Sequence, residues 1–287
     1  MQNKSQLAKE LGVSRASLYY KPKMEAKDLE LKKKIREIHA KHPNYGHKRL
    51  ALELKVNRKR VLRVMKKFGI KPPRRRSQKP RKADDEGKPA VKHPNLIKNI
   101  CPIRPDLIWA SDFTYIKFKG KFIYLATVTD IFTRRIVGWQ VLDRHDTSLV
   151  KLAFENAFKR TGVKPSICHS DQGSEYTGSE YIKMLTNQEI KVSFSAKASP
   201  WQNGFQESFY AGFKLDLGHI DRFENLGKLI EAIHLTLHYY NNQRIHTALK
   251  MPPQNFFDEY LIKFNSTVKS IGFNCRKEIH NLVENCV

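Results

Sequence analysis

The sequence is poor in cysteine and contains no long apolar run. Its four cysteines, Cys101, Cys168, Cys275 and Cys286, form no closely spaced pair, so neither a disulfide framework nor a zinc finger is supported. No stretch of eighteen apolar residues is present, and the first residues lack the charged and then apolar pattern of a secretion signal. These absences predict a cytoplasmic protein.

Acidic residues are also scarce. The 287 residues include 28 Asp and Glu against 53 Lys and Arg, which gives a formal net charge of +25 and a sequence pI of about 9.9. An excess of this size is typical of a protein that binds a polyanion, most simply nucleic acid. The alternatives are a ribosome-associated protein and a soluble protein that is merely basic. We favour nucleic acid, and therefore a cytoplasmic protein associated with the nucleoid.

Residues 1–24 are predicted to form a partial helix-turn-helix. Ser5–Leu11 has helical spacing, a turn follows at Gly12, and Ser14 is placed to cap a second helix. Polar and basic residues then lie at the exposed start of that second helix, where a DNA-reading helix carries its contacts. The same pattern also fits an ordinary helical hairpin.

Residues 25–70 are predicted to form a helical DNA-binding domain. Apolar residues recur at helical spacing over Lys27–Lys41, Lys48–Leu54 and Arg58–Phe68. The residues expected to form its small core are Leu50, Leu54, Val61, Leu62, Met65 and Phe68.

The outer side of the third of these helices is strongly basic. Positively charged residues there lack the acids that usually balance a solvated face, which favours contact with phosphates. The residues predicted to contact DNA are Arg58, Lys59, Arg60 and Arg63. A solvated surface without DNA contacts is the alternative.

Residues 71–105 are predicted to be a basic linker. Helical spacing ends there, Pro, Arg and Lys become frequent, and the part over residues 71–96 is expected to be extended and mobile. Arg74, Arg75 and Arg76 would hold a phosphate backbone without reading its sequence.

Residues 106–264 change from helical to strand patterning. Three segments rich in β-branched and aromatic residues predict an antiparallel meander at residues 108–118, 122–129 and 135–142. The segments after the meander predict a helix at 148–160, a strand at 166–170, a helix at 179–186, a strand at 191–194, and helices at 202–217 and 226–240. This order predicts an α/β domain with a mixed five-stranded sheet and flanking helices, preceded by the all-α region. Residues 265–287 are left as a C-terminal tail.

The helix predicted at residues 202–217 carries two stripes. The apolar stripe consists of Phe205, Phe209, Phe213 and Leu217. The polar stripe, on another face, consists of Asn203, Glu207, Tyr210 and Lys214. One helix would therefore pack on a core and direct an acid and a lysine elsewhere, with Asn203 expected as its cap.

Three carboxylates are expected to converge. Asp112 lies in the first strand, Asp171 directly follows the fourth, and Glu207 lies on the two-striped helix. The first and fourth strands of a mixed sheet can be neighbours, so Asp112 and Asp171 would meet with Glu207 above them. Such oxygen ligands suit Mg²⁺ or Mn²⁺, and two ions about 4 Å apart stabilise the attacking and leaving oxygens of a phosphoryl transfer.

Other acids near the strands are given structural roles. Asp130 stands too early to be the second acid and is expected to cap a turn. Asp143 and Asp146 are expected to cap the following helix. Glu175 lies near Asp171 but is not expected to be a ligand.

Motifs around the acids resemble those of a known family. They are Trp109–Ile116, His169–Tyr176, Asn203–Gly204 with Glu207 and Lys214, and His238–Leu249 followed by Pro252–Pro253. Together they resemble the DDE transposases of the retroviral-integrase superfamily, and most closely the second-open-reading-frame product of the bacterial IS-three insertion-sequence family. The resemblance extends over about residues 7–260.

This resemblance implies an RNase H-like fold and a metal-dependent DNA transposase. Asp112, Asp171 and Glu207 would hold two Mg²⁺ or Mn²⁺ ions, a strand would be nicked by water, and the freed 3′ hydroxyl would be joined to target DNA. Lys214 would contact DNA near the scissile phosphate. The implied partners are element-end and target DNA, further copies of the chain assembled on DNA, and the product of an upstream reading frame.

Two alternatives stay open. A non-catalytic regulator would use only the helical N-terminal region, although the presence of all three acids argues against an inactive core. An RNase H-like nuclease would cut branched or hybrid substrates without joining ends. Arg244 and His246 fit either DNA binding or the satisfaction of buried polar groups.

Overall fold

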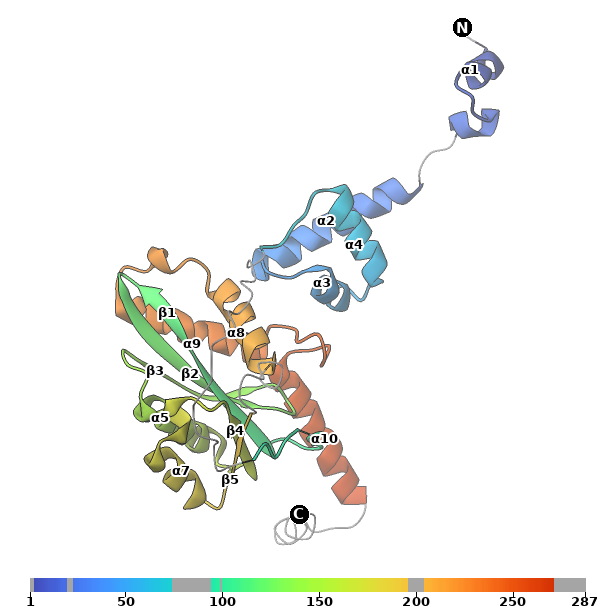
Figure 1. Cartoon of the computed structure of the whole chain (residues 1–287). Coiled ribbons are helices and arrows are strands. Elements are labelled where there is room, and N and C mark those ends of the chain that lie inside the picture. Colours follow the sequence, from blue (N-terminus) through green and yellow to red (C-terminus); the bar gives the residue numbers. More distant parts are fainter. Residues whose placement is uncertain (1–2, 20–22, 74–93, 99, 196–203, 271–287) are drawn as a thin grey trace. The chain divides into compact units, whose positions relative to one another are not determined.

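The chain divides into two compact units, Met1–Pro73 and Arg74–Val287 (Figure 1). The computed structural model describes residues 3–19, 23–73, 94–98, 100–195 and 204–270. Within these ranges, every helix is too short or too polar to cross a membrane.

The first unit begins with a helix and a tight turn. Helix α1 spans Lys4–Glu10, and the side chain of Asn3 accepts a hydrogen bond from the backbone of its first turn. Gly12 has a φ of +62°, which a glycine adopts without strain. The second helix, η1 (Arg15–Tyr19), is a single 3₁₀ segment over the described residues, so the predicted second α-helix is shorter and tighter than expected. The predicted cap is confirmed, because Ser14 Oγ accepts from Ser17 N.

Three further helices form a small bundle in the same unit. They are α2 (Lys23–Lys41), α3 (His47–Glu53) and α4 (Arg58–Lys67). Of the predicted core residues, Leu50, Val61 and Met65 are buried, whereas Leu54, Leu62 and Phe68 are only partly buried. Additional core residues come from α2 and α4, namely Leu31, Ile35 and Val64.

A buried carboxylate neutralises part of the basic face of α4. Asp28 on α2 accepts hydrogen bonds from both terminal nitrogens of Arg63, at 2.8 and 2.5 Å, and from Lys67 at 3.3 Å. The Arg63 guanidinium accordingly lowers the pKa of Asp28 below its ordinary value. The expectation that this face lacks balancing acids is therefore wrong at Arg63 and Lys67. Arg58, Lys59 and Arg60 remain the part of the predicted DNA contact that this acid does not engage.

The second unit is built on the predicted five-stranded mixed sheet. Its strands are β1 (Ile108–Phe118), β2 (Lys121–Asp130), β3 (Ile136–Leu142), β4 (Ile167–Ser170) and β5 (Lys191–Phe194). Their order is β3-β2-β1-β4-β5, with β1 antiparallel to β2 and parallel to β4. The antiparallel meander and the neighbouring first and fourth strands are both confirmed.

Helices cover both faces of this sheet. One face packs against α5 (Thr147–Thr161), α6 (Ser174–Thr177) and α7 (Ser179–Thr186), and the other against α8 (Gly204–Leu217) and α9 (Leu226–Asn242), with the short 3₁₀ segment η3 (Ile220–Arg222) between these two. The split follows the alternation of side chains along β1, since Trp109 joins the α5 cluster and Ile116 joins the α8 cluster. The predicted Phe stripe of α8 is buried at Phe209, Phe213 and Leu217.

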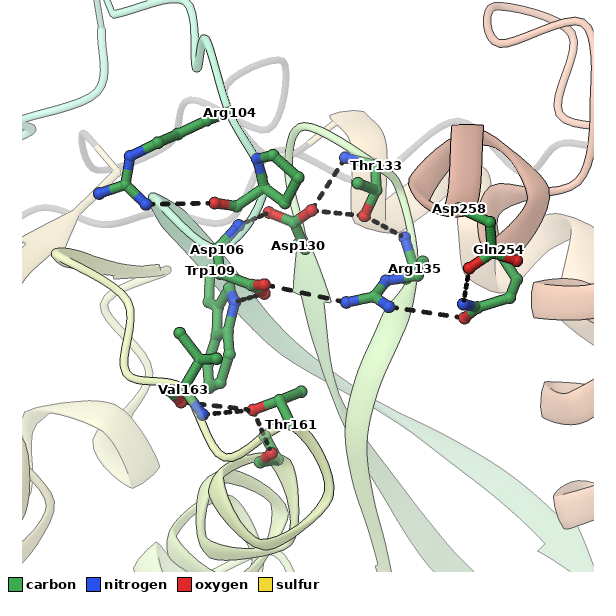
Figure 2. A network of polar contacts seen from close by, with 12 residues as sticks. Arg104, Asp106, Trp109, Asp130, Thr133, Arg135, Thr161, Val163, Gln254 and Asp258 are labelled. Atoms are coloured by element: carbon green, nitrogen blue, oxygen red, sulfur yellow. Dashed lines mark hydrogen bonds and ion pairs between the residues drawn. The ribbon is translucent and has the colours of Figure 1, made fainter. Parts of the chain in front are cut away.

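Helix α10 (Pro253–Ser270) was not expected from the sequence and runs past the predicted domain end at residue 264. A polar network ties its first turn to the sheet, and Figure 2 shows it from close by. Arg135 donates to Gln254 Oε1 at 3.5 Å, and its guanidinium lies 3.5 Å from the ring centroid of Phe257 and 3.9 Å from Asp106 Oδ2. Asp106 in turn accepts from Trp109 Nε1 at 2.9 Å.

Asp130 belongs to the same network and caps a turn, as predicted. Its carboxylate accepts from the backbone N–H groups of Asp106 and Thr133, at 3.1 and 2.9 Å, and from the Thr133 hydroxyl. These three hydrogen bonds engage the Asp130 carboxylate in the turn that joins β2 to β3.

The end of the predicted linker is packed against the sheet. Leu96 and Ile97 join an apolar cluster with Ile108 and Ile167, and Leu96 N donates to Ser193 Oγ at 2.9 Å. The expectation of an extended, mobile segment over residues 71–96 is therefore wrong at Leu96.

A buried ion pair fastens α8 to the segment after α9. Arg244 Nε lies 2.6 Å from Asp216 Oδ2, and the two side chains are 8% and 6% exposed. Gly212 allows this approach, because a Cβ there would lie 2.6 Å from Arg244 Nη2. Of the two roles considered for Arg244, the structure supports the satisfaction of a buried polar group.

We predict that Arg244→Leu destabilises the second unit by about 3–5 kcal/mol, because it leaves Asp216 buried without its cation. Urea unfolding followed by tryptophan fluorescence measures this, since all three tryptophans lie in this unit. The double variant Arg244→Leu/Asp216→Leu should regain much of the loss. Arg144→Leu is the control, because its pair with Asp146 is exposed and should contribute less than about 1 kcal/mol. Equal losses in the two single variants would contradict the prediction.

Candidate active site

Asp112 lies in β1, and Asp171 directly follows β4, the parallel neighbour of β1. The pairing of the two strands matches Ile108 with Ile167 and Ala110 with His169, so each acid lies two residues beyond a paired residue. Because side chains alternate along β1, Asp112 shares a face with Ile116, which packs against α8.

The first two turns of α8 are fixed to this face by buried polar side chains. Gln206 is 1% exposed, and its amide donates to Ala110 O at 2.9 Å and lies 3.1–3.2 Å from Thr129 Oγ1. Tyr210 donates its hydroxyl to Asp112 O at 2.5 Å, with Thr127 Oγ1 2.8 Å away. Glu207 is the residue after Gln206 and is exposed in the first turn. The helix therefore presents Glu207 beside the strand that carries Asp112.

The two other acids act electrostatically on Asp112. Burial is the main cause that raises its pKa to about 8, and the charges of Asp171 and Glu207 raise it further against a hydrogen bond from Phe113 N. The pKa of Asp171 is also raised by burial and by the charge of Glu175, against a hydrogen bond from Gly173 N. His169 does not offset these charges, because burial lowers its pKa to about 4 and keeps it neutral.

The three acids interact electrostatically, but their side chains do not surround a common point. Across the described ranges, no three His, Cys, Asp or Glu side chains form a group able to hold a metal ion. The donor set itself, made only of hard oxygen atoms, suits Mg²⁺ or Mn²⁺.

Two acids near the site have other partners. Glu175 is buried and accepts from His145 Nδ1 at 2.8 Å. Asp146 caps α5 by accepting from Ser148 N at 3.0 Å, as predicted. Beneath Asp112, Ser111 Oγ and Tyr176 Oη lie 3.1 Å apart within the core.

The predicted DNA-binding residues fall in three places. Lys214 lies on α8, and its Nζ is 5.0 Å from the ring centroid of Tyr115 on β1. Arg58, Lys59, Arg60 and Arg63 lie on α4 in the first unit. Arg74, Arg75, Arg76 and the predicted helix cap Asn203 lie outside the described residues.

Sequence patterning misplaced one residue of this region and missed another. Tyr210 was assigned to the polar stripe with Glu207, but its ring is buried and only its hydroxyl bonds to the sheet. Gln206 was given no role. The spacing contained a signal for both, because Gln206, Tyr210 and Phe213 recur at steps of four and three on the face that packs against the sheet.

Family models match both units. Two models of an integrase core domain match residues 102–200 and 188–253, and a model of an HTH-like domain matches residues 26–78. The HTH-like match falls on the bundle of α2, α3 and α4, and not on residues 1–24, where a partial helix-turn-helix was predicted.

The chain is also similar to known proteins over most of its length. It is 32% identical over 239 residues to the transposase for insertion sequence element IS904 of Lactococcus lactis subsp. lactis (strain IL1403), covering 80% of this chain and 94% of that protein. It is 30% identical over 253 residues to the InsK protein of insertion sequence element IS150 of Escherichia coli (strain K12), covering 83% and 87%. Among solved structures, the HTLV-2 integrase catalytic core domain in complex with magnesium is 21% identical, with a TM-score of 0.47, and covers 54% of this chain and 98% of that chain.

We predict that Asp112→Asn stabilises the metal-free protein at pH 8. The folded-state pKa of about 8 lies above the ordinary value of 3.8, so the folded form holds this proton longer and wild-type stability falls as the pH rises between these two values. The Asp112→Asn variant has no carboxyl group to ionise at this position, so its stability does not fall for this reason. Its melting temperature in EDTA should match that of wild type near pH 4 and exceed it by several degrees at pH 8.

Asp143→Asn is the control for this measurement, because it removes a carboxylate at an exposed position. It should follow the wild-type pH dependence. If the melting temperature of Asp112→Asn also follows the wild-type pH dependence, the buried charge of Asp112 does not destabilise the folded protein.

Proposed function

The chain belongs to the family of insertion-sequence transposases that carry an integrase core domain, and we propose that it cuts DNA at the ends of an insertion element and joins the freed 3′ hydroxyls to target DNA. Its second unit has the RNase H-like mixed sheet of integrase cores, and the helical bundle of its first unit falls within the HTH-like match. The net charge of +25 supports DNA as the substrate.

The observation that carries the proposal is the parallel pairing of β1 with β4 together with the electrostatic coupling of the acids. The pairing of Ala110 with His169, each two residues before an acid, supports the convergence of Asp112 and Asp171, and the charges of Asp171 and Glu207 both raise the pKa of Asp112. Because all three side chains are carboxylates that repel one another, their placement fits a site that binds divalent cations. Asp112, Asp171 and Glu207 would hold two Mg²⁺ or Mn²⁺ ions, which when bound activate the attacking oxygen and stabilise the leaving oxygen.

The remaining side chains position the acids and the DNA. Gln206 and Tyr210 hold the first turns of α8 on β1, so that Glu207 keeps its place relative to Asp112. Lys214 lies two turns beyond Glu207 on α8 and would bind a phosphate beside the one that is cut.

DNA recognition is assigned to the first unit and to the basic residues that follow it in the sequence. Arg58, Lys59 and Arg60 would contact phosphates along α4, and Arg74, Arg75 and Arg76 would hold a phosphate backbone as well. We further propose that several copies of the chain assemble on the element ends, and that the product of an upstream reading frame joins this complex.

We predict that Asp171→Asn or Glu207→Gln lowers strand cleavage by at least about a thousandfold, equivalent to roughly 4 kcal/mol of transition-state stabilisation, while DNA affinity changes little. The assay incubates the purified protein with duplex DNA of the element's terminal sequence and Mg²⁺ or Mn²⁺, and resolves nicked and joined products on a denaturing gel. Filter binding in EDTA gives the affinity.

Glu180→Gln is the matched control, because this acid on α7 is exposed and pairs with Lys151 on the neighbouring helix α5. It should cut and join DNA as wild type does. Cleavage retained by Glu207→Gln would overturn the assignment of the acids. Nicked but never joined products from wild type would identify a nuclease instead of a transposase.

A further inference from the structure

The β1–β2 hairpin carries two exposed aromatic rings close to the proposed site. Tyr115 is 59% exposed and Phe122 is 47% exposed, and their ring centroids lie 5.5 Å apart in an edge-to-face arrangement. They share one face of the hairpin, because Tyr115 pairs with Tyr124 and Phe122 pairs with Lys117, two positions away on each strand. Two large aromatic side chains that are exposed side by side indicate a binding surface.

The rings continue a row of aromatic side chains along one face of the hairpin. The Phe113 ring stacks on His145, with centroids 6.1 Å apart. Tyr124 lies 4.7 Å from His145 and 6.4 Å from Phe113 by the same measure. Phe113, Tyr115, Tyr124 and Phe122 therefore share a face of the hairpin, which is opposite to the face that carries the Asp112 side chain.

Positive charge surrounds the two exposed rings. Lys117, Lys119 and Lys121 are exposed on the hairpin, and the hairpin from Phe113 to Phe122 contains no acid. Lys214 Nζ lies 5.0 Å from the Tyr115 ring centroid, and a hollow of about 370 Å³ beside this ring is lined in part by Tyr115, Lys117, Lys214 and Ile220. Rings flanked by lysines complement a flat base attached to a phosphate backbone.

The distance from the acids suits a nucleotide near the cut. Tyr115 is three residues beyond Asp112, so its side chain leaves β1 on the opposite face from the carboxylate, but Lys214 on α8 reaches its ring, with Nζ 5.0 Å from the ring centroid. Lys214 is seven residues beyond Glu207 on a helix, which corresponds to about 10 Å. This rise along α8 equals about three nucleotide steps of 3.4 Å along a DNA strand.

We propose that Tyr115 and Phe122, with Lys117, Lys121 and Lys214, form a stacking platform for an unpaired DNA base about three nucleotides from the phosphate that is cut. The base must be unpaired because a base inside a duplex has both of its faces covered by its neighbours. This inference rests on the proposed function, and it adds that the chain prefers DNA whose end is frayed.

The test compares full-length protein on two duplexes in EDTA, one fully paired and one with three mismatched terminal base pairs that carry 2-aminopurine. Stacking on an aromatic ring quenches 2-aminopurine fluorescence. Wild type should bind the frayed duplex more tightly and quench it. Tyr115→Ala should lose about tenfold in affinity for the frayed duplex and little for the paired one, because a base–aromatic stack contributes about 1–3 kcal/mol.

Tyr115→Phe keeps the ring and should behave as wild type, which separates stacking from the hydroxyl. Phe264→Ala is the matched control, since it removes a ring that is 40% exposed on α10 in the same unit. If Tyr115→Ala folds poorly by circular dichroism, Phe122→Leu takes its place and should show a smaller loss in the same direction.

Three results would overturn the platform: equal affinity of wild type for both duplexes, unchanged quenching by Tyr115→Ala and Phe122→Leu, or a change only in oligomer mass, which would show that the rings cover a second copy of the chain. These measurements follow DNA binding without metal, so they can contradict the platform while the proposed function still holds. The proposed function is contradicted separately, if wild type does not cut DNA in Mg²⁺ or Mn²⁺.

Discussion

The hydrogen bonds that hold the start of α8 to β1 are the interaction on which the rest of the site depends. Gln206 and Tyr210 bury an amide and a phenol and direct them to the backbone carbonyls of Ala110 and Asp112. A buried polar group left without a partner costs about 1–3 kcal/mol. The position of α8 on β1 that satisfies both groups is therefore strongly favoured. Neighbouring residues on a helix lie about 100° apart. Burying Gln206 therefore places Glu207 at the rim of the interface, where it stays exposed beside Asp112.

The distribution of acids makes the surface more basic than the composition suggests. Five acids are buried and engaged inside the two units, namely Asp28, Asp106, Asp130, Glu175 and Asp216. Their charges hold helices and turns together instead of screening the lysines and arginines outside. The ion pairs inside the units are thus separate from the positive charge outside, which would preserve the long-range attraction for DNA that the proposed function requires.

Local patterns predicted most of the second unit and little of what joins its elements. Strand alternation and helical spacing placed α7 and β5 to the residue, and put Asp112 in the first strand and Asp171 directly after the fourth. Helix α10 was missed because its contacts with Arg135 and Phe132 are tertiary and leave a weak periodic signal. The pairing of Asp28 with Arg63 spans 35 residues and is invisible to any short window. Tyr210 was placed on the wrong stripe because its ring, not its hydroxyl, decides where it packs.

The strand order has a consequence for the newly made chain. Strands β1, β2 and β3 are consecutive and pair locally, so this meander can form as soon as it leaves the ribosome. The other side of β1 is filled by β4, which is separated from it in the sequence by β2, β3 and α5, and Glu207 follows later still. An unfinished or truncated polypeptide that stops before α8 holds a folded sheet edge but lacks the last acid. Under the proposed function, a chain would become able to cut DNA only late in its synthesis, after its first unit and the strands of the meander have been made.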